Sequence, residues 1–375
     1  MTTLKPRLPG SIPLMILLGI NSSHAKGRVF MKFQLVINIE RSDDSVPMDE
    51  VMRHTLEMVQ IADRGGFSIV WAAEHHGLEM NVAPNPFQIL TWWAGNTNEI
   101  RLGTAVAVAA YWHPIRLAGE AAFFDLLSGG RLEFGIGSGA YQREFDRMKP
   151  GLKQSDAYKY MQEMLPALKA LWAGDYEHDG ENWSFPSTTS VPKPVQKPHP
   201  PLWVAARSPI TFDYAIANGC NIISWPLTRS FDEAELYKTQ FEEAIAKSPD
   251  CKRPLFAMMR HAALYENDAG RDSAISALQS SMGCFENLFR NLGDVVNGFP
   301  KQIPVEELVE RDQYDPNMLE ENLMFGSPDS VIHKLRRYET LGIDHFAYLA
   351  SMNWGLKEQK RSLELFCNEV IPEFR

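Results

Sequence analysis

Short apolar runs alternate with amphipathic stretches along most of this chain. The first runs span residues 33–38, 68–71 and 100–109. After the first run, Val51, Thr55, Met58 and Val59 recur at the spacing that places side chains on one helix face. The third run is apolar on both faces, as expected of a parallel strand buried on both sides. The pattern therefore predicts strand–helix units.

The same alternation continues to the C-terminus. We predict further strands over residues 132–136, 202–206, 221–225, 254–264 and 343–349. We predict helices over residues 87–96, 114–127, 155–172, 231–246 and 363–370, with two more that begin at Pro209 and Pro328. Ser327 before Pro328 is a typical helix start, because serine caps the first turn and proline fits its first position.

Eight strands alternating with about as many helices predict an α/β fold of the (β/α)8 TIM-barrel type, with insertions in the βα loops. A doubly wound sheet stays open, because a count of strands does not prove closure. Two insertions interrupt the alternation. Residues 175–200 are rich in proline, so we expect a short hairpin and loop there, and residues 268–325 are irregular in pattern and are the candidate lid.

The first thirty residues stand apart from this pattern. Lys5 and Arg7 precede an apolar run over residues 12–20, which is the outline of a signal peptide. An over-long gene start is the alternative that we favour, because Met31 opens a strand directly. We expect residues 1–30 to be a poorly packed extension and residues 31–375 to form a single barrel domain.

Charge and cysteine content restrict the possible partners. The net charge of −10 and the pI near 5.5 argue against non-specific binding to nucleic acid or to an anionic membrane. The four cysteines lie far apart without a CxxC motif, which favours a reduced cytoplasm. His75 and His76 are adjacent and would point in opposite directions on an extended segment, so we expect no metal site.

Polar residues follow several predicted strands, where the ligand-binding loops of a barrel lie. Arg207, Ser208 and Thr211 stand between a strand end and a helix start, and they could bind a phosphate. Alternatively, Ser208 only caps the helix and Arg207 is a solvated charge. One histidine of the His75–His76 pair could act as a general acid or base, or it could be a hydrogen-bonded loop residue.

A glycine-rich stretch over residues 129–141 is the most distinctive segment. Gly135, Gly137 and Gly139 permit close backbone approach or positive φ. The segment from Gly135 to Ala140 also satisfies a dinucleotide-binding pattern. A Rossmann dehydrogenase is therefore an alternative, and it would bind NAD and place this strand first in its sheet.

Together these motifs resemble those of the bacterial luciferase-like flavin monooxygenases, from about Met31 to the C-terminus. The resemblance is carried by short motifs at residues 71–76, 103–106, 113–116, 126–131, 134–141, 206–208 with Thr211, and 223–225. It implies a TIM barrel that holds FMN at the carboxyl ends of its strands. It specifies no substrate.

The resemblance also implies roles for individual residues. The FMN phosphate should meet Ser208 and Thr211, with Ser138 and Gly139 close by. Luciferases carry an arginine at this strand exit and a glutamate at the later helix start, whereas this chain has Ser138 and Arg207. We infer that the phosphate-neutralising charge has moved from one loop to the other.

Five more residues match positions around the flavin. The Ala105–Val106 bond matches a non-proline cis peptide under the ring, and Ser224 and Trp225 match residues near it. His75 matches the histidine that handles protons during catalysis.

The function implied is an FMN-dependent monooxygenase that uses externally reduced flavin and O2 to oxidise a small organic substrate of apolar character. A separate NAD(P)H-dependent flavin reductase and a homodimer are also implied. Two alternatives remain on the same barrel. One is a deazaflavin-dependent dehydrogenase, which transfers hydride and ignores O2, and the other is a flavin-binding protein without catalysis.

Overall fold

The computed structural model describes residues 30–41 and 43–375. Residues 1–29, which make up nearly all of the expected N-terminal extension, therefore lie outside the described part of the chain.

Eight parallel strands form a closed barrel. They are β1 (Lys32–Val36), β2 (Ile69–Ala72), β3 (Arg101–Thr104), β5 (Leu132–Gly137), β8 (Leu202–Ala205), β9 (Asn221–Ser224), β10 (Phe256–Leu264) and β14 (His345–Leu349). They pair in chain order around the barrel, and β10 pairs with both β9 and β14 while β14 pairs with β1. The predicted TIM barrel is confirmed. The doubly wound sheet and the Rossmann alternative are wrong, because β5 lies inside the circuit between β3 and β8.

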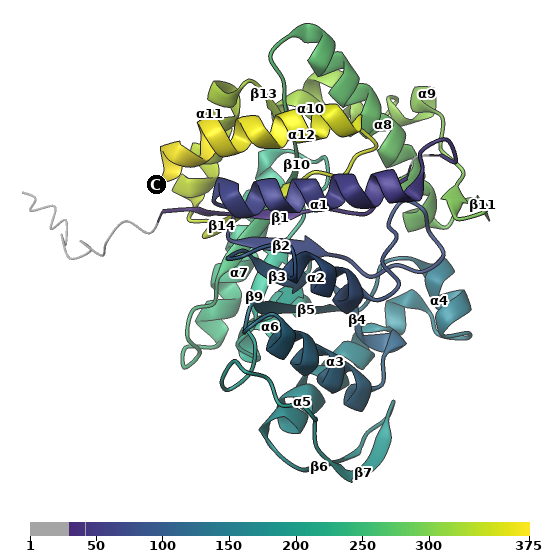
Figure 1. Ribbon diagram of the computed structural model, residues 1–375, viewed down its shortest axis with the longest axis vertical. Coiled ribbons are helices and arrows are strands. Elements are labelled where there is room, and N and C mark those ends of the chain that lie inside the picture. Colours follow the sequence, from purple (N-terminus) through teal and green to yellow (C-terminus); the bar gives the residue numbers. More distant parts are fainter. Residues whose placement is uncertain (1–29, 42) are drawn as a thin grey trace, which may run out of the picture.

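Twelve α-helices are present in the described residues, and Figure 1 shows most of them around the outside of the barrel. They are α1 (Met48–Gly65), α2 (Pro86–Ala94), α3 (Pro114–Leu127), α4 (Gln142–Met148), α5 (Tyr158–Ala173), α6 (Pro209–Ala217), α7 (Phe231–Lys247), α8 (Asp268–Arg290), α9 (Val305–Leu308), α10 (Pro316–Asn322), α11 (Pro328–Leu341) and α12 (Leu356–Leu365). The predicted start of α11 is confirmed, since the Ser327 side chain accepts a hydrogen bond from Ser330 N. No described helix has the length and apolar character needed to cross a membrane.

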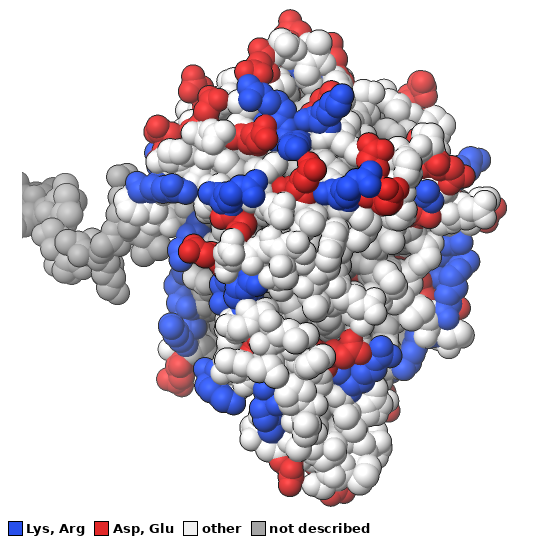
Figure 2. Space-filling view, viewed as in Figure 1, with Lys and Arg blue, Asp and Glu red and all other residues white. Residues whose placement is uncertain are grey.

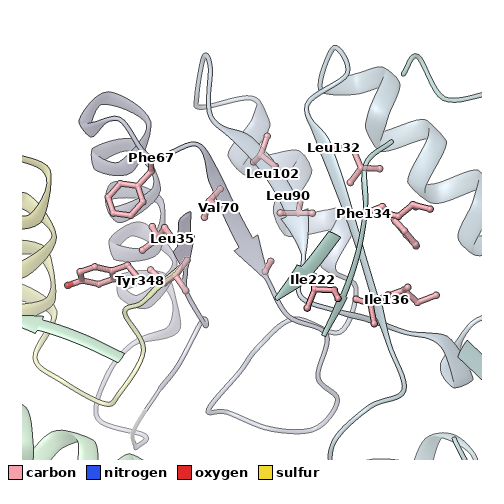
Figure 3. Close-up of a cluster of buried hydrophobic side chains, with 14 of the residues drawn as sticks. Leu35, Phe67, Val70, Leu90, Leu102, Leu132, Phe134, Ile136, Ile222 and Tyr348 are labelled. Atoms are coloured by element: carbon pink, nitrogen blue, oxygen red, sulfur yellow. The ribbon is translucent and has the colours of Figure 1, made fainter. Parts of the chain in front are cut away.

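Alternate residues of the strands pack into two separate cores. Leu35 and Val70 face the helices, in the large cluster that also contains Leu90 of α2 and is drawn in Figure 3. Their neighbours Val36 and Trp71 point into the barrel, where they pack with residues of β8, β9, β10 and β14. This alternation follows from the two-residue repeat of a strand. The inward-facing side chains fill the barrel interior below the strand ends.

Six short strands of the described residues lie outside the barrel circuit. They are β4 (Ala107–Val108), β6 (Tyr176–Asp179), β7 (Ser184–Thr188), β11 (Val295–Val296), β12 (Phe299–Pro300) and β13 (Met324–Gly326). The antiparallel pair β6–β7 confirms the hairpin predicted within residues 175–200. Strand β4 pairs with β5 after an interruption at Ala105–Val106, so the predicted strand over residues 100–109 is not continuous. The Ala105–Val106 bond is cis, as the resemblance implied.

The prediction that residues 268–325 are irregular is wrong for the first part of that segment. Residues 268–290 form α8, a 23-residue helix. Its buried face carries Ile275, Leu278 and Met282 at helical spacing, but Gln279 and Asn287 are buried on the same helix. Polar and small residues on the buried face hid the amphipathic repeat from a reading of the sequence.

Candidate functional site

A cavity of about 680 Å³ opens at the carboxyl ends of the barrel strands. Its volume lies in the range of small-molecule and cofactor sites. All ten sequence-predicted site residues line it, which are His75, Ala105, Val106, Ser138, Gly139, Arg207, Ser208, Thr211, Ser224 and Trp225. The fold thus brings together side chains from the ends of β2, β3, β5, β8 and β9.

The part of the cavity beside β8, which we call the β8 side, carries a cation and two hydroxyl groups at the start of α6. Ser208 occupies the N-cap position, but its side chain makes no capping hydrogen bond. Its Oγ instead lies 3.0 Å from Thr211 Oγ1. Arg207 Nε donates to Tyr237 Oη at 3.2 Å, which holds the guanidinium at the cavity. A guanidinium, two hydroxyls and the free N–H groups of a first helical turn suit an anion such as phosphate.

The glycines of β5 serve close packing between neighbouring strands. A Cβ added to Gly135 would lie 1.9 Å from Thr104 O, and one added to Gly137 would lie 2.5 Å from Val106 Cγ2. Gly139 has a φ of +87°, in the left-handed region that favours glycine. These glycines therefore let β5 approach β3 and the cis bond, which explains the apparent dinucleotide pattern without a dinucleotide.

Two histidine–carboxylate pairs stand at the end of β2. His75 Nδ1 lies 3.0 Å from Glu144 Oε2, and His76 Nε2 lies 2.9 Å from Glu74 Oε1. Glu144 also accepts from the His76 backbone N–H at 2.6 Å. Glu74 accepts from Trp112 Nε1 at 2.8 Å. The two adjacent histidines thus have different partners.

Both carboxylates are almost fully buried, with Glu74 2% and Glu144 3% exposed. The Tyr141 ring stacks on the His75 ring, with centroids 5.1 Å apart. Burial and the nearby Glu144 carboxylate raise the pKa of Tyr141, so its hydroxyl stays protonated at neutral pH. His75 is therefore held on one edge by a carboxylate and on one face by a neutral ring.

The opposite part of the cavity, which we call the β1 side, was not predicted. β1 lies four strands from β8 in either direction around the closed circuit. The β1 side is formed by polar residues that follow β1, β2 and β14 or lie on β10, namely Asn38, Glu40, Asn81, His261 and Ser351. Burial and the neighbouring Arg260 charge lower the pKa of His261 to about 3, so its imidazole is neutral.

Helix α8 borders the same cavity with larger side chains. Met282, Phe285 and Phe289 line it. The Phe285 ring lies 5.4 Å from the Trp225 ring and 6.3 Å from the Tyr141 ring, both in edge-on contacts. The segment expected to be a lid therefore contributes an ordered aromatic helix to the site.

Sequence reasoning missed Glu40, Glu144 and Phe285. Glu144 lies in the first turn of α4, which follows the glycine-rich stretch, and that position was the available signal. Glu40 and Phe285 carry no local signal, because only the fold brings them to the strand ends.

Comparisons with known proteins agree with this geometry. The model of a family described as luciferase-like monooxygenase matches residues 31–345. The oxygenase component of the flavin-dependent trigonelline monooxygenase of Acinetobacter baylyi is 40% identical over 348 residues, covering 92% of this chain and 96% of the relative. An alkanal monooxygenase alpha chain of Photorhabdus luminescens is 29% identical over 197 residues, covering 52% of this chain and 54% of the relative.

Two solved structures share the fold. The oxygenating constituent of 3,6-diketocamphane monooxygenase of Pseudomonas putida, in complex with FMN, has a TM-score of 0.72 at 18% identity and covers 92% of this chain and 99% of its own. An F420-dependent secondary alcohol dehydrogenase has a TM-score of 0.71 at 18% identity and covers 93% of this chain and 99% of its own. At this identity the likeness concerns the fold alone.

Proposed function

The chain belongs to the luciferase-like monooxygenase family of flavin-dependent enzymes, and from this premise we propose that it uses reduced FMN and O2 to oxidise a small organic molecule. The observation that carries the proposal is the single cavity lined by all ten predicted site residues. Reduced flavin, when bound, would supply the electrons that allow O2 to react with the substrate.

The residues present fit FMN at both ends of the molecule. Arg207, Ser208 and Thr211 would hold the phosphate, since they offer a cation and two hydroxyls that do not cap the helix. Trp225 Nε1 is a buried donor without a hydrogen-bond partner among the described residues. The polar edge of a flavin ring carries carbonyl and ring-nitrogen acceptors for such a donor.

His75 would hold or move a proton beside the flavin. Glu144 accepts a hydrogen bond from Nδ1 and so fixes the imidazole orientation, which leaves Nε2 as the nitrogen available for exchange. Glu144 is thus a positioning residue. The apolar α8 side chains and the buried barrel interior would help to exclude water from this region when the cavity is filled.

A separate NAD(P)H-dependent reductase would supply the reduced flavin. The related A. baylyi protein is named as an oxygenase component, and this supports a two-component arrangement for the present chain. We also propose that the pair works in the cytoplasm, where the four cysteines, which are free in the structure, would stay reduced.

We further propose a homodimer formed through α3. This helix exposes Phe123, Leu126 and Leu127, and the neighbouring Val191 is 80% exposed. Figure 2 shows few charged side chains over α2 and α3, in contrast to the charged surface over α1 and α12. Contiguous exposed apolar residues of this kind mark association surfaces.

The first substrate to test is trigonelline, the compound in the name of the 40% identical relative. The test supplies reduced FMN from a separate reductase under ¹⁸O2 and measures the product by mass spectrometry. The proposal predicts one ¹⁸O atom per oxidised substrate molecule. Flavin binding without label in any product would favour the non-catalytic alternative. Oxidation of a substrate by oxidised deazaflavin, or reduction of a substrate by reduced deazaflavin, without O2 would favour the dehydrogenase.

A further inference from the structure

The β1 side of the cavity carries one carboxylate whose hydrogen bonding is incomplete. Glu40 Oε1 accepts from the backbone N–H groups of Met352 and Asn353, at 2.9 and 2.8 Å. Its other oxygen has no hydrogen-bond or ion-pair partner in the described part of the chain. The two amides fix the side chain, while the free oxygen leaves it able to bind a further group.

The neighbouring cation does not neutralise Glu40. Arg41 Nε and Nη2 donate to the two carboxylate oxygens of Glu79 at 3.0 and 2.8 Å. Arg207, which lines the same cavity, lies on the opposite β8 side. Glu74 and Glu144 are already satisfied by histidine and N–H donors. Glu40 is therefore the carboxyl group on the β1 side that has no cationic partner among the described residues.

Two buried polar atoms at the cavity support a polar ligand there. His261 is 3% exposed and Asn81 is 4% exposed, and both line the cavity. His261 Nδ1 and Asn81 Oδ1 have no hydrogen-bond partner among the described residues. Since buried polar atoms are nearly always paired in a complete site, these two atoms await a ligand that carries polar groups.

Aromatic side chains line the same cavity. Phe285 contacts Trp225 and Tyr141 edge-on, and Phe289 stacks on Phe285 with centroids 5.5 Å apart. Glu40 lines the same cavity as Phe285 and Phe289 of α8. Aromatic faces beside a carboxylate favour a flat cationic group, which gains from the ring quadrupoles as well as from the ion pair.

We propose that Glu40 and the α8 aromatic side chains form a subsite for a positively charged nitrogen ring of the substrate, such as an N-alkylated pyridinium. This rests on the proposed function, because it places a substrate in the cavity proposed for the flavin. It also refines the expectation of an apolar substrate. The proposed substrate still contains an apolar aromatic ring, but this ring carries a positive charge.

The experiment compares two isosteric probes by isothermal titration calorimetry on the protein loaded with oxidised FMN. Trigonelline carries a methylated pyridinium ring and a carboxylate. 3-Methylbenzoate has the same shape and carboxylate but a neutral ring. The wild type should bind trigonelline about tenfold or more tightly than 3-methylbenzoate.

The variant E40Q should lose that preference by weakening the binding of trigonelline while leaving that of 3-methylbenzoate unchanged. E50Q is the matched control, because Glu50 is exposed and lines a neighbouring cavity with Glu40 but not the main one. It removes the same charge and should keep the preference. E40D retains the negative charge and should keep part of the preference for trigonelline.

Equal affinities of the wild type for the two probes would overturn the proposal, as would an unchanged preference in E40Q or no binding of either probe. The wild-type comparison stands even if E40Q fails to fold. Repeating the titrations without FMN separates this proposal from the proposed function. Selective cation binding by a protein that ignores FMN would refute the flavin role and leave the subsite standing.

Discussion

The β8 side and the β1 side of the cavity differ in how the chain builds them. On the β8 side, Arg207, Ser208 and Thr211 lie within one strand–helix junction. On the β1 side, Glu40, Asn81, His261 and Ser351 come from positions spread over most of the chain. Residues of one strand–helix junction stand together in the sequence as a short motif. Residues that come from distant loops form no motif, and each can be substituted independently of the others. We therefore assign the cofactor to the first side and substrate choice to the second.

The largest effect is expected from the substitution of His75, the group at which the proposed cofactor and the substrate meet. H75A should lower the turnover number by about 10²- to 10⁴-fold, the range typical of a lost general acid or base. FMN affinity should stay unchanged, because the phosphate contacts are untouched. Steady-state oxidation and flavin binding are measured on the same samples, with the exposed His333→Ala as control. Unchanged turnover would remove His75 from the mechanism.

The second prediction tests the β8 side alone. R207A should weaken FMN binding by about 10- to 100-fold, because a charge-assisted contact to phosphate is lost. Riboflavin lacks the phosphate, so its affinity should be the same in R207A and the wild type. Fluorescence titration with both flavins checks this. An equal loss for the two flavins would place the role of Arg207 away from the phosphate.

A smaller effect is expected on α8. F285L keeps an apolar side chain but removes the ring that contacts Trp225 and Tyr141. The Michaelis constant for an aromatic substrate should rise by about three- to tenfold, the size of one aromatic contact. The dissociation constant for FMN should not change. A loss confined to FMN binding would reverse the assignment of the two sides.

The last prediction concerns stability rather than activity. Burial raises the pKa of Glu40 from 4.5 to about 7. The stability that this raised pKa contributes is present below about pH 4.5 and is lost as pH rises through 7. A glutamine side chain cannot ionise, so E40Q should lose less stability than the wild type between pH 5 and pH 8, by roughly 2 kcal/mol.

Chemical denaturation of the wild type, E40Q and the control E50Q at both pH values measures this difference. If E40Q and the wild type lost the same stability between the two pH values, the carboxyl group of Glu40 would not be held in the low-polarity surroundings that the structure gives it.

The barrel was predictable because its strands are short, apolar and bounded by glycine and proline, and because parallel strands gather their ends at one face. The β8 side was predictable for the same reason, since Arg207 and Ser208 directly follow a strand. Helix α8 was not predictable, because its buried face contains Gln279 and Asn287.

The β1 side could not be predicted from the sequence at all. Glu40 lies beyond the end of the first strand without a recognisable motif, and its amide partners at Met352 and Asn353 are more than three hundred residues away. The pairing of His75 with Glu144 likewise depends on how the loop after β5 folds back toward β2.

A crystal structure of the protein with FMN would test the central claim most directly. The account predicts that the phosphate contacts Arg207, Ser208 and Thr211, that the flavin ring lies beside the Ala105–Val106 bond, and that the β1 side stays free for a substrate. An FMN molecule whose phosphate lies against the β1 side, or whose ring fills the space between Glu40 and Phe285, would contradict it.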